Sequence, residues 1–148
     1  MASRRKSREL ALQMLFQCDL GKHTPAHVIS TFLQAQRVDP EVKSFARELF
    51  EGTLADIEAL DRLVSEQAAN WRLERMAAVD RNLLRVALYE LLHHPETPPA
   101  VVIDEAIEIA RRFSGEDSVD FVNGVLDGIR KSLVAVKAKE IPAPRSEA

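Results

Sequence analysis

The sequence has few of the residues that build cross-linked or membrane-spanning proteins. It holds a single cysteine, Cys18, so no disulfide can form within the chain, which fits a reducing compartment. No run of eighteen apolar residues occurs, which argues against a membrane span. Glu9, Gln13 and Gln17 interrupt the apolar residues near the start at helical intervals, which argues against a signal peptide. We therefore expect a soluble cytoplasmic protein.

Candidates for catalysis and metal binding are equally few. The five glycines form no phosphate-binding loop. His93 and His94 are adjacent, so on a helix their side chains would point about 100° apart, a poor arrangement for a metal pair. Cys18 has no lysine or histidine beside it that would activate its thiol, and we interpret it as a small buried apolar residue. We expect no catalytic residue, no metal ion and no cofactor.

Helical periodicity runs through nearly the whole chain, because apolar residues recur three and four positions apart. Polar residues followed by proline mark two helix starts, at Thr24-Pro25 and Asp39-Pro40. Gly52 leaves open whether one long helix or two short ones follow the second start, since glycine inside a helix costs about 1 kcal/mol relative to alanine. The predicted helices are 8–20, one after Pro25, one or two over 40–64, 79–92, 99–113, and one from the turn at 114–118 to about 133.

This pattern predicts an all-α fold of about seven helices. With 148 residues the chain suits one domain, which we place at residues 1–136 with a flexible tail at 137–148. The segment 79–92 is apolar around most of its circumference, which predicts a central helix with neighbours on several sides.

The densest positive charge lies at the start of a chain whose net charge is −3. Arg4, Arg5, Lys6 and Arg8 lead directly into a predicted helix, although each cation near a helix N-terminus costs roughly 0.3–1 kcal/mol. A solvated tail and an RNA-binding segment both remain open. Arginine forks suit phosphate oxygens, and arginine-rich segments that order on RNA are well known. We expect that replacing the four cations by alanine weakens RNA binding and leaves stability unchanged or slightly higher.

Three stretches resemble the NusB family of bacterial transcription antitermination factors: RRKSRELALQMLF (4–16), VDRNLLRVALYELL (79–92) and PPAVVIDEAIEIARRFSGEDSVDFVNGVLDGI (98–129). The resemblance implies two small helical bundles and a protein that does no chemistry. It also implies binding to the boxA element of ribosomal RNA transcripts together with NusE, a small-subunit ribosomal protein. The complex would keep RNA polymerase elongating through rRNA operons. NusB-like proteins occur as monomers and as homodimers, so a homodimer remains open.

The resemblance also implies roles for individual residues. Glu74 and Asp80 match acidic positions near the meeting of RNA and NusE. Phe16 stands where family members often have tyrosine, and Asp104 replaces a common asparagine. The implied RNA-binding residues are Arg4, Arg5, Lys6, Arg8, Gln13, Phe16, Asp117 and Phe121.

The residues by themselves leave alternatives open. For Phe16, packing in the core is the favoured interpretation over stacking on bases, whereas Phe121 fits packing at the edge of the core as well as it fits stacking. Glu74 and Asp80 are either acids that cap a helix start or acids that steer a basic partner, in which case RNA and NusE binding would reinforce each other. Asn123-Gly124 inside a helix predicts close helix–helix contact. The competing function is a helical protein–protein interaction module without specific RNA binding.

Overall fold

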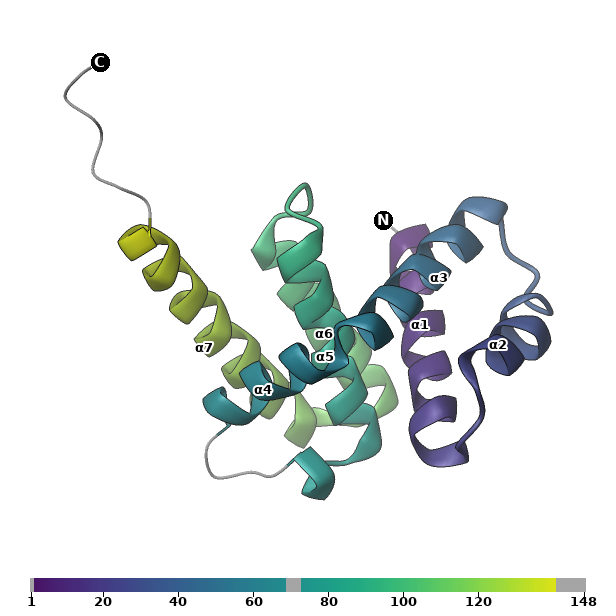
Figure 1. Cartoon of the computed structure of the whole chain (residues 1–148), viewed down its shortest axis with the longest axis horizontal. Coiled ribbons are helices and arrows are strands. Elements are labelled where there is room, and N and C mark those ends of the chain that lie inside the picture. The colour runs from purple at the N-terminus through teal and green to yellow at the C-terminus, as the bar shows by residue number, and fades with distance from the viewer. Residues whose placement is uncertain (1, 69–72, 141–148) are drawn as a thin grey trace, which may run out of the picture.

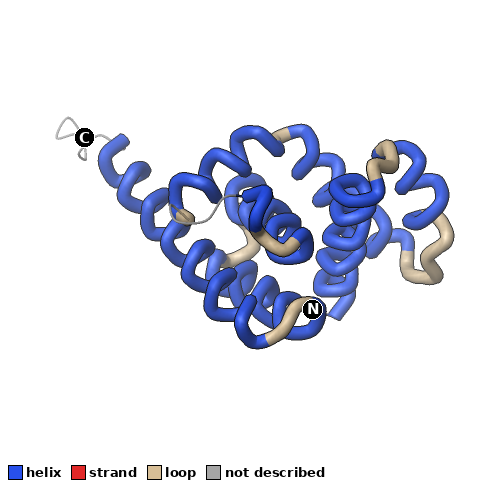
Figure 2. Tube along the Cα trace, turned by 90° about the horizontal axis from the view of Figure 1, so that it is seen from below, coloured by secondary structure: helices blue, strands red, loops and turns tan. Residues whose placement is uncertain are grey.

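The computed structural model describes residues 2–68 and 73–140, and within them helices joined by short turns and loops are the only regular secondary structure (Figures 1 and 2). The predicted all-α fold with seven α-helices is confirmed for these residues. Two short non-α elements, η1 and η2, complete the order. The elements are α1 (Ala2–Gly21), α2 (Pro25–Val28), the π-helical η1 (Ile29–Leu33), α3 (Pro40–Ala55), α4 (Ile57–Gln67), the 3-10 helix η2 (Leu73–Arg75), α5 (Ala78–His93), α6 (Pro99–Phe113) and α7 (Glu116–Glu140).

Proline and capping residues set several helix starts as the sequence indicated. The Thr24 hydroxyl accepts a hydrogen bond from the His27 backbone N–H, and proline holds the first position of α2, α3 and α6. The chain between residues 40 and 67 forms two helices, and the break falls at Asp56 rather than at Gly52. Gly52 lies inside α3, where α5 approaches so closely that a Cβ atom would clash with the ring and hydroxyl of Tyr89.

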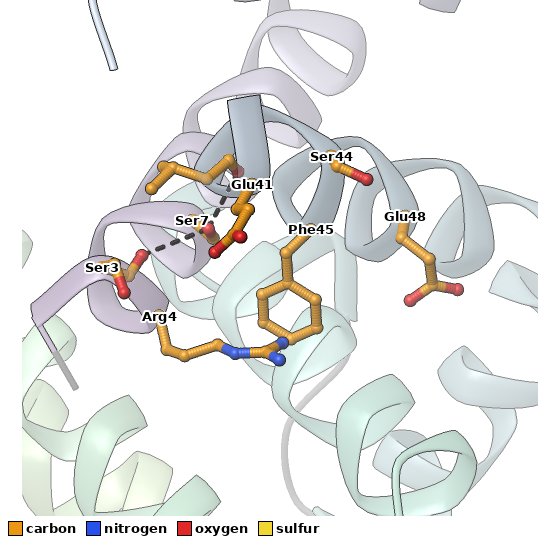
Figure 3. A pocket seen from close by; sticks show the side chains of 8 residues that line it. Ser3, Arg4, Ser7, Glu41, Ser44, Phe45 and Glu48 are labelled. Atoms are coloured by element: carbon orange, nitrogen blue, oxygen red, sulfur yellow. Dashed lines mark hydrogen bonds between the residues drawn. The ribbon is translucent and has the colours of Figure 1, made fainter. Parts of the chain in front are cut away.

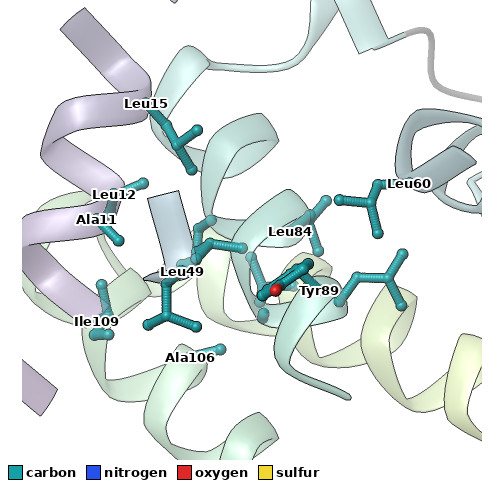
Figure 4. Close-up of a cluster of buried hydrophobic side chains, with 14 of the residues drawn as sticks. Ala11, Leu12, Leu15, Leu49, Leu60, Leu84, Tyr89, Ala106 and Ile109 are labelled. Atoms are coloured by element: carbon teal, nitrogen blue, oxygen red, sulfur yellow. The ribbon is translucent and has the colours of Figure 1, made fainter. Parts of the chain in front are cut away.

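The helices form two groups around one core. In Figure 1, α1, α2 and α3 lie on one side and α4 to α7 on the other, and α5 contacts helices of both groups. This confirms the prediction of a central helix over 79–92. The core side chains converge on α5 (Figure 4). The largest fully buried apolar side chains are Phe50, Leu10, Met14, Leu15, Leu49, Leu60, Leu83, Leu84, Leu88, Ile109 and Leu126.

One expectation for the last helix needs revision. Asn123 and Gly124 are exposed, and a Cβ atom on Gly124 would meet nothing within 4 Å, so the predicted helix–helix contact there is wrong. The close approach is at Gly128 instead, where the Gln67 side chain of α4 fills the space. Helix α7 continues to Glu140, residues 141–148 lie outside the described residues, and the division into a domain at 1–136 and a flexible tail at 137–148 stays a prediction.

None of the helices in the described ranges is long and apolar enough to cross a membrane.

Candidate RNA-binding surface

The basic segment forms the first turns of α1, packed against the protein. Arg4, Arg5 and Lys6 are exposed, whereas Ser7 and Arg8 are buried. The Ser7 hydroxyl donates a hydrogen bond of 2.9 Å to the carbonyl oxygen of Val42, at the start of α3. The segment is therefore presented on a fixed helix, not on a free tail.

Arg8 is the anchor of this segment. Its side chain is 7% exposed, and its Nε and Nη2 atoms donate to Glu90 of α5 at 2.8 and 2.7 Å. The Glu90 side chain is 2% exposed, so the two charges neutralise each other out of water. Removing one partner of such a pair destabilises a protein by about 3–5 kcal/mol, because the other charge stays buried. The expectation that alanine at all four cations preserves stability is therefore wrong for Arg8.

Arg5 is held by a carboxylate but remains partly open. Its Nε and Nη2 atoms donate to Glu105 of α6 at 3.1 and 2.6 Å, while 44% of its side chain stays exposed. These hydrogen bonds lower the pKa of Glu105, so its carboxylate is charged at neutral pH. Asp104, the departure from the family pattern, is exposed directly before Glu105.

Arg4 and Lys6 are the most available cations of the segment. The Arg4 guanidinium lies 3.9 Å from the centre of the Phe45 ring, in a cation–π contact at the rim of a pocket of about 350 Å³ (Figure 3). Glu41 and Glu48 line the same pocket. Lys6 is exposed and makes no ion pair within the described part of the chain. Both side chains can therefore meet a phosphate without breaking an ion pair.

Gln13 and Phe16 lie further along α1, in an apolar groove of about 310 Å³ that we call the α1–α6 groove. Phe113, at the end of α6, also lines the groove, and 37% of its surface is exposed. Beside it, Arg112 of α6 donates to Glu9 of α1 at 2.9 Å. The remaining lining residues are Leu12, Gln17, Phe32 and Val79.

Sequence reasoning missed Phe113 and Arg112. Phe113 completes the apolar stripe of its helix, and that pattern predicts a core residue. One signal could have distinguished Phe113 from a core residue: it lies in the last turn of α6, just before the Ser114-Gly115 turn. At the end of a helix, the apolar face can extend beyond the residues that cover it.

The remaining predicted residues lie at helix starts and differ in exposure. Asp117 is exposed in the first turn of α7, and Phe121, one turn further, is half-buried against the core. Glu74 is exposed in η2. Asp80 is 9% exposed, and its carboxylate accepts hydrogen bonds from the hydroxyls of Ser114 and Ser118 at 3.0 and 2.9 Å.

Asp80 therefore ties the start of α5 to the turn between α6 and α7. Its hydrogen bonds go to serine hydroxyls rather than to the backbone amides of its own helix, so the capping interpretation does not describe them. A buried carboxylate in this position is also poorly placed to meet a partner directly. Glu74 alone of the two acids faces solvent.

Comparison with known proteins shows that the sequence of this chain is similar to those of one protein family. The model of the NusB family matches residues 5–131. The transcription antitermination protein NusB of Koribacter versatilis is 52% identical over 139 residues, covering 93% of this chain and 95% of the relative. The protein of the same description from Sorangium cellulosum is 46% identical over 133 residues, covering 90% and 95%.

Solved structures agree on the fold. T. maritima NusB superposes with a TM-score of 0.81 at 39% identity, covering 86% of this chain and 90% of that chain. A chain in the crystal structure of the antitermination factors NusB and NusE in complex with dsRNA gives a TM-score of 0.81 at 24% identity, covering 89% and 98%. At that identity the second match shows the fold alone.

Proposed function

This chain belongs to the NusB family, and from that membership we propose that it is a transcription antitermination factor that binds boxA RNA of ribosomal RNA transcripts together with NusE. In this role it promotes elongation by RNA polymerase through rRNA operons. It acts in the cytoplasm and by binding alone. The observation that carries the proposal is the cationic start of α1, held rigidly by the Arg8–Glu90 ion pair beside the α1–α6 groove.

The exposed cations would supply the affinity for the RNA backbone. Arg4 and Lys6 are open to phosphates, and Arg5 keeps 44% of its side chain exposed although it is paired with Glu105. The logarithm of the RNA-binding constant falls linearly with the logarithm of the salt concentration, and each phosphate neutralised on a single strand makes this slope steeper by roughly 0.7. Arg8 contributes by fixing α1, since its own fork is filled by Glu90.

The α1–α6 groove would receive bases. Phe16 of α1 and Phe113 of α6 both line it and offer aromatic surface, and Gln13 offers an amide that can donate to and accept from a base edge. Stacking of a base on an aromatic side chain contributes about 1–3 kcal/mol. We include Asp117 and Phe121 at the start of α7 as further contact residues.

The NusE surface is proposed at η2, where Glu74 is an exposed carboxylate. A ribosomal RNA-binding protein is expected to be basic, and exposed carboxylates accelerate and orient the docking of a basic partner. The solved complex of NusB and NusE with dsRNA contains a chain of the same fold, so this fold is compatible with joint binding.

A binding titration separates this function from the alternative, a helical protein–protein interaction module. Labelled boxA RNA and a scrambled strand of equal length are titrated with the protein at several salt concentrations, with and without saturating NusE. We expect preference for boxA and tighter RNA binding when NusE is present. NusE binding with no preference for boxA would favour the protein-interaction module.

A further inference from the structure

Glu105 lies between two of the cations at the start of α1. Its Oε2 atom lies 2.6 Å from Nη2 of Arg5, and its Oε1 atom lies 3.1 Å from Nε of Arg5 and 3.3 Å from Nη1 of Arg8. The carboxylate comes from α6 and bridges to α1 at the edge of solvent, where its side chain is 13% exposed.

Arg5 holds this carboxylate as it would hold a phosphate group. Both anions offer two oxygens to the Nε and Nη2 donors of a guanidinium fork. A phosphate that approached Arg5 would find the fork occupied and a negative charge beside it. Since 44% of the Arg5 side chain is exposed, the approach itself is open.

None of the other cations of the segment is both exposed to RNA and paired with a carboxylate in the described structure. Arg8 is buried, and both oxygens of Glu90 are engaged with it, so RNA cannot compete for that pair. Arg4 and Lys6 have no carboxylate at ion-pair distance among the described residues. Arg5 is therefore the one cation of the four that is reachable and already paired in the described structure.

We propose that Glu105 is a specificity-determining residue of the RNA surface, because its carboxylate competes with RNA phosphate for Arg5. The inference rests on the proposed function and deepens it. An RNA held correctly by its other contacts presents a phosphate to Arg5 at high effective concentration and displaces Glu105. A strand held only by Arg4 and Lys6 does not, so Glu105 lowers binding to unrelated RNA more than binding to the correct target.

The same ion pair would have the opposite effect if it served to orient Arg5 for RNA. In that case neutralising Glu105 would loosen Arg5 and weaken RNA binding. The sign of the change therefore separates competition from orientation.

The test uses Glu105→Gln, which removes the charge and keeps an oxygen that can accept hydrogen bonds. We expect binding to a scrambled single strand to tighten by about two- to five-fold, the range of a partly exposed ion pair. Binding to boxA RNA should tighten less, so discrimination falls. The salt slope for the scrambled strand should steepen by roughly 0.7, one additional phosphate contact.

Glu108→Gln is the matched control, since Glu108 lies one turn further along α6 and pairs with Arg111. It makes the same change in net charge and removes no hydrogen bond to Arg5, on which Glu108 acts only through a coulombic interaction smaller than that of Glu105. A second variant, Arg5→Gln, tests the proposal from the other side: it should weaken binding to boxA RNA and change binding to the scrambled strand little.

Three results would overturn the inference. Glu105→Gln could change the affinity for both RNA strands no more than Glu108→Gln does, or it could weaken RNA binding. Arg5→Gln could lower the affinity for boxA RNA and for the scrambled strand equally. Unmodified protein that shows no preference for boxA over the scrambled strand would contradict the proposed function itself. A failure of the inference alone leaves that preference intact, so the two failures are distinguishable.

Discussion

Arg8 and Glu90 join the first helix to the central helix through two parallel hydrogen bonds of 2.8 and 2.7 Å, both shielded from water. Arg8 belongs to the basic segment in sequence, yet its charge is neutralised inside the protein. The pair sets the position of Arg4, Arg5 and Lys6 relative to α5 and α6. The stability of the fold and the presentation of its cationic surface thus depend on the same contact.

Breaking this pair should be among the most destabilising single changes at the start of α1. Arg8→Ala leaves the Glu90 carboxylate buried without its partner, and we expect the free energy of unfolding to fall by about 3–5 kcal/mol in a urea titration. Replacing both residues by apolar ones, Arg8→Met with Glu90→Leu, should recover most of the loss. Arg47→Ala, which breaks the exposed Arg47–Glu51 pair, is the control and should change stability by no more than about 0.5 kcal/mol. A similarly small effect of Arg8→Ala would contradict the buried pair.

Two glycine substitutions should change stability in opposite directions. Gly124→Ala adds a methyl group into open solvent on a helix and should stabilise the protein by up to about 1 kcal/mol. Gly52→Ala drives a methyl group into the Tyr89 side chain and should destabilise the protein by about 1–3 kcal/mol. Thermal melts followed by circular dichroism measure both. Stabilisation by both substitutions would mean that α3 and α5 are further apart than the structure shows.

His94 should contribute stability that is lost as pH rises. Burial lowers its pKa, but hydrogen bonds to Glu96 and Glu48 outweigh burial and raise the pKa above its ordinary value of 6.5. Because the folded state binds the proton more tightly, this contribution is fully present below about pH 6.5 and fades as pH rises through the raised pKa. Denaturant unfolding at several pH values should show this loss in the unmodified protein, and His94→Gln should reduce it. Equal pH dependence of the two proteins would remove His94 as the cause.

Glu74 and Asp80 should respond differently to charge reversal. Glu74 is exposed, so Glu74→Lys should slow association with NusE while the melting temperature stays within about a degree or two. Asp80→Lys places a cation against the Ser114 and Ser118 hydroxyls and should lower the melting temperature whatever its effect on NusE. Stopped-flow association rates with NusE, with Glu66→Lys as an exposed control on α4, give the comparison. An unchanged rate for Glu74→Lys would place the NusE surface elsewhere.

Helical periodicity and proline positions were enough to predict the fold. Apolar residues at helical spacing reveal which face of a helix is buried, and Pro25, Pro40 and Pro99 mark their helix starts directly. The break at Asp56 could not be predicted, because Gly52 is the weaker helix former. The need for glycine at position 52 comes instead from Tyr89, far along the chain, which lies where a Cβ atom would be. Glycine spacing alone likewise did not separate Gly124, which is exposed, from Gly128, which packs against Gln67.

The sequence was enough to predict which segment forms the candidate site, but not which of its cations is buried and which is exposed. Four cations in five positions look equivalent in the sequence, and only tertiary structure separates Arg8, which is buried on Glu90, from Lys6, which is exposed. The partners Glu90 and Glu105 lie far from the cluster in sequence, in helices whose apolar pattern hides them. Phe113 was missed for a related reason, because periodicity shows a face of its helix but not where the neighbouring helix stops covering it.

The central claim is that exposed cations at the start of α1 bind RNA phosphates, and one salt titration tests it most directly. Affinity for boxA RNA is measured across a range of salt concentrations for the unmodified protein, for Arg4→Ala with Lys6→Ala, and for Arg62→Ala, an exposed cation of α4. Because the double variant can no longer neutralise two of the phosphates, its slope should be shallower by roughly 1.4, at unchanged melting temperature, while Arg62→Ala keeps the original slope. An unchanged slope in the double variant would show that these cations do not bind the RNA and would contradict the proposed surface.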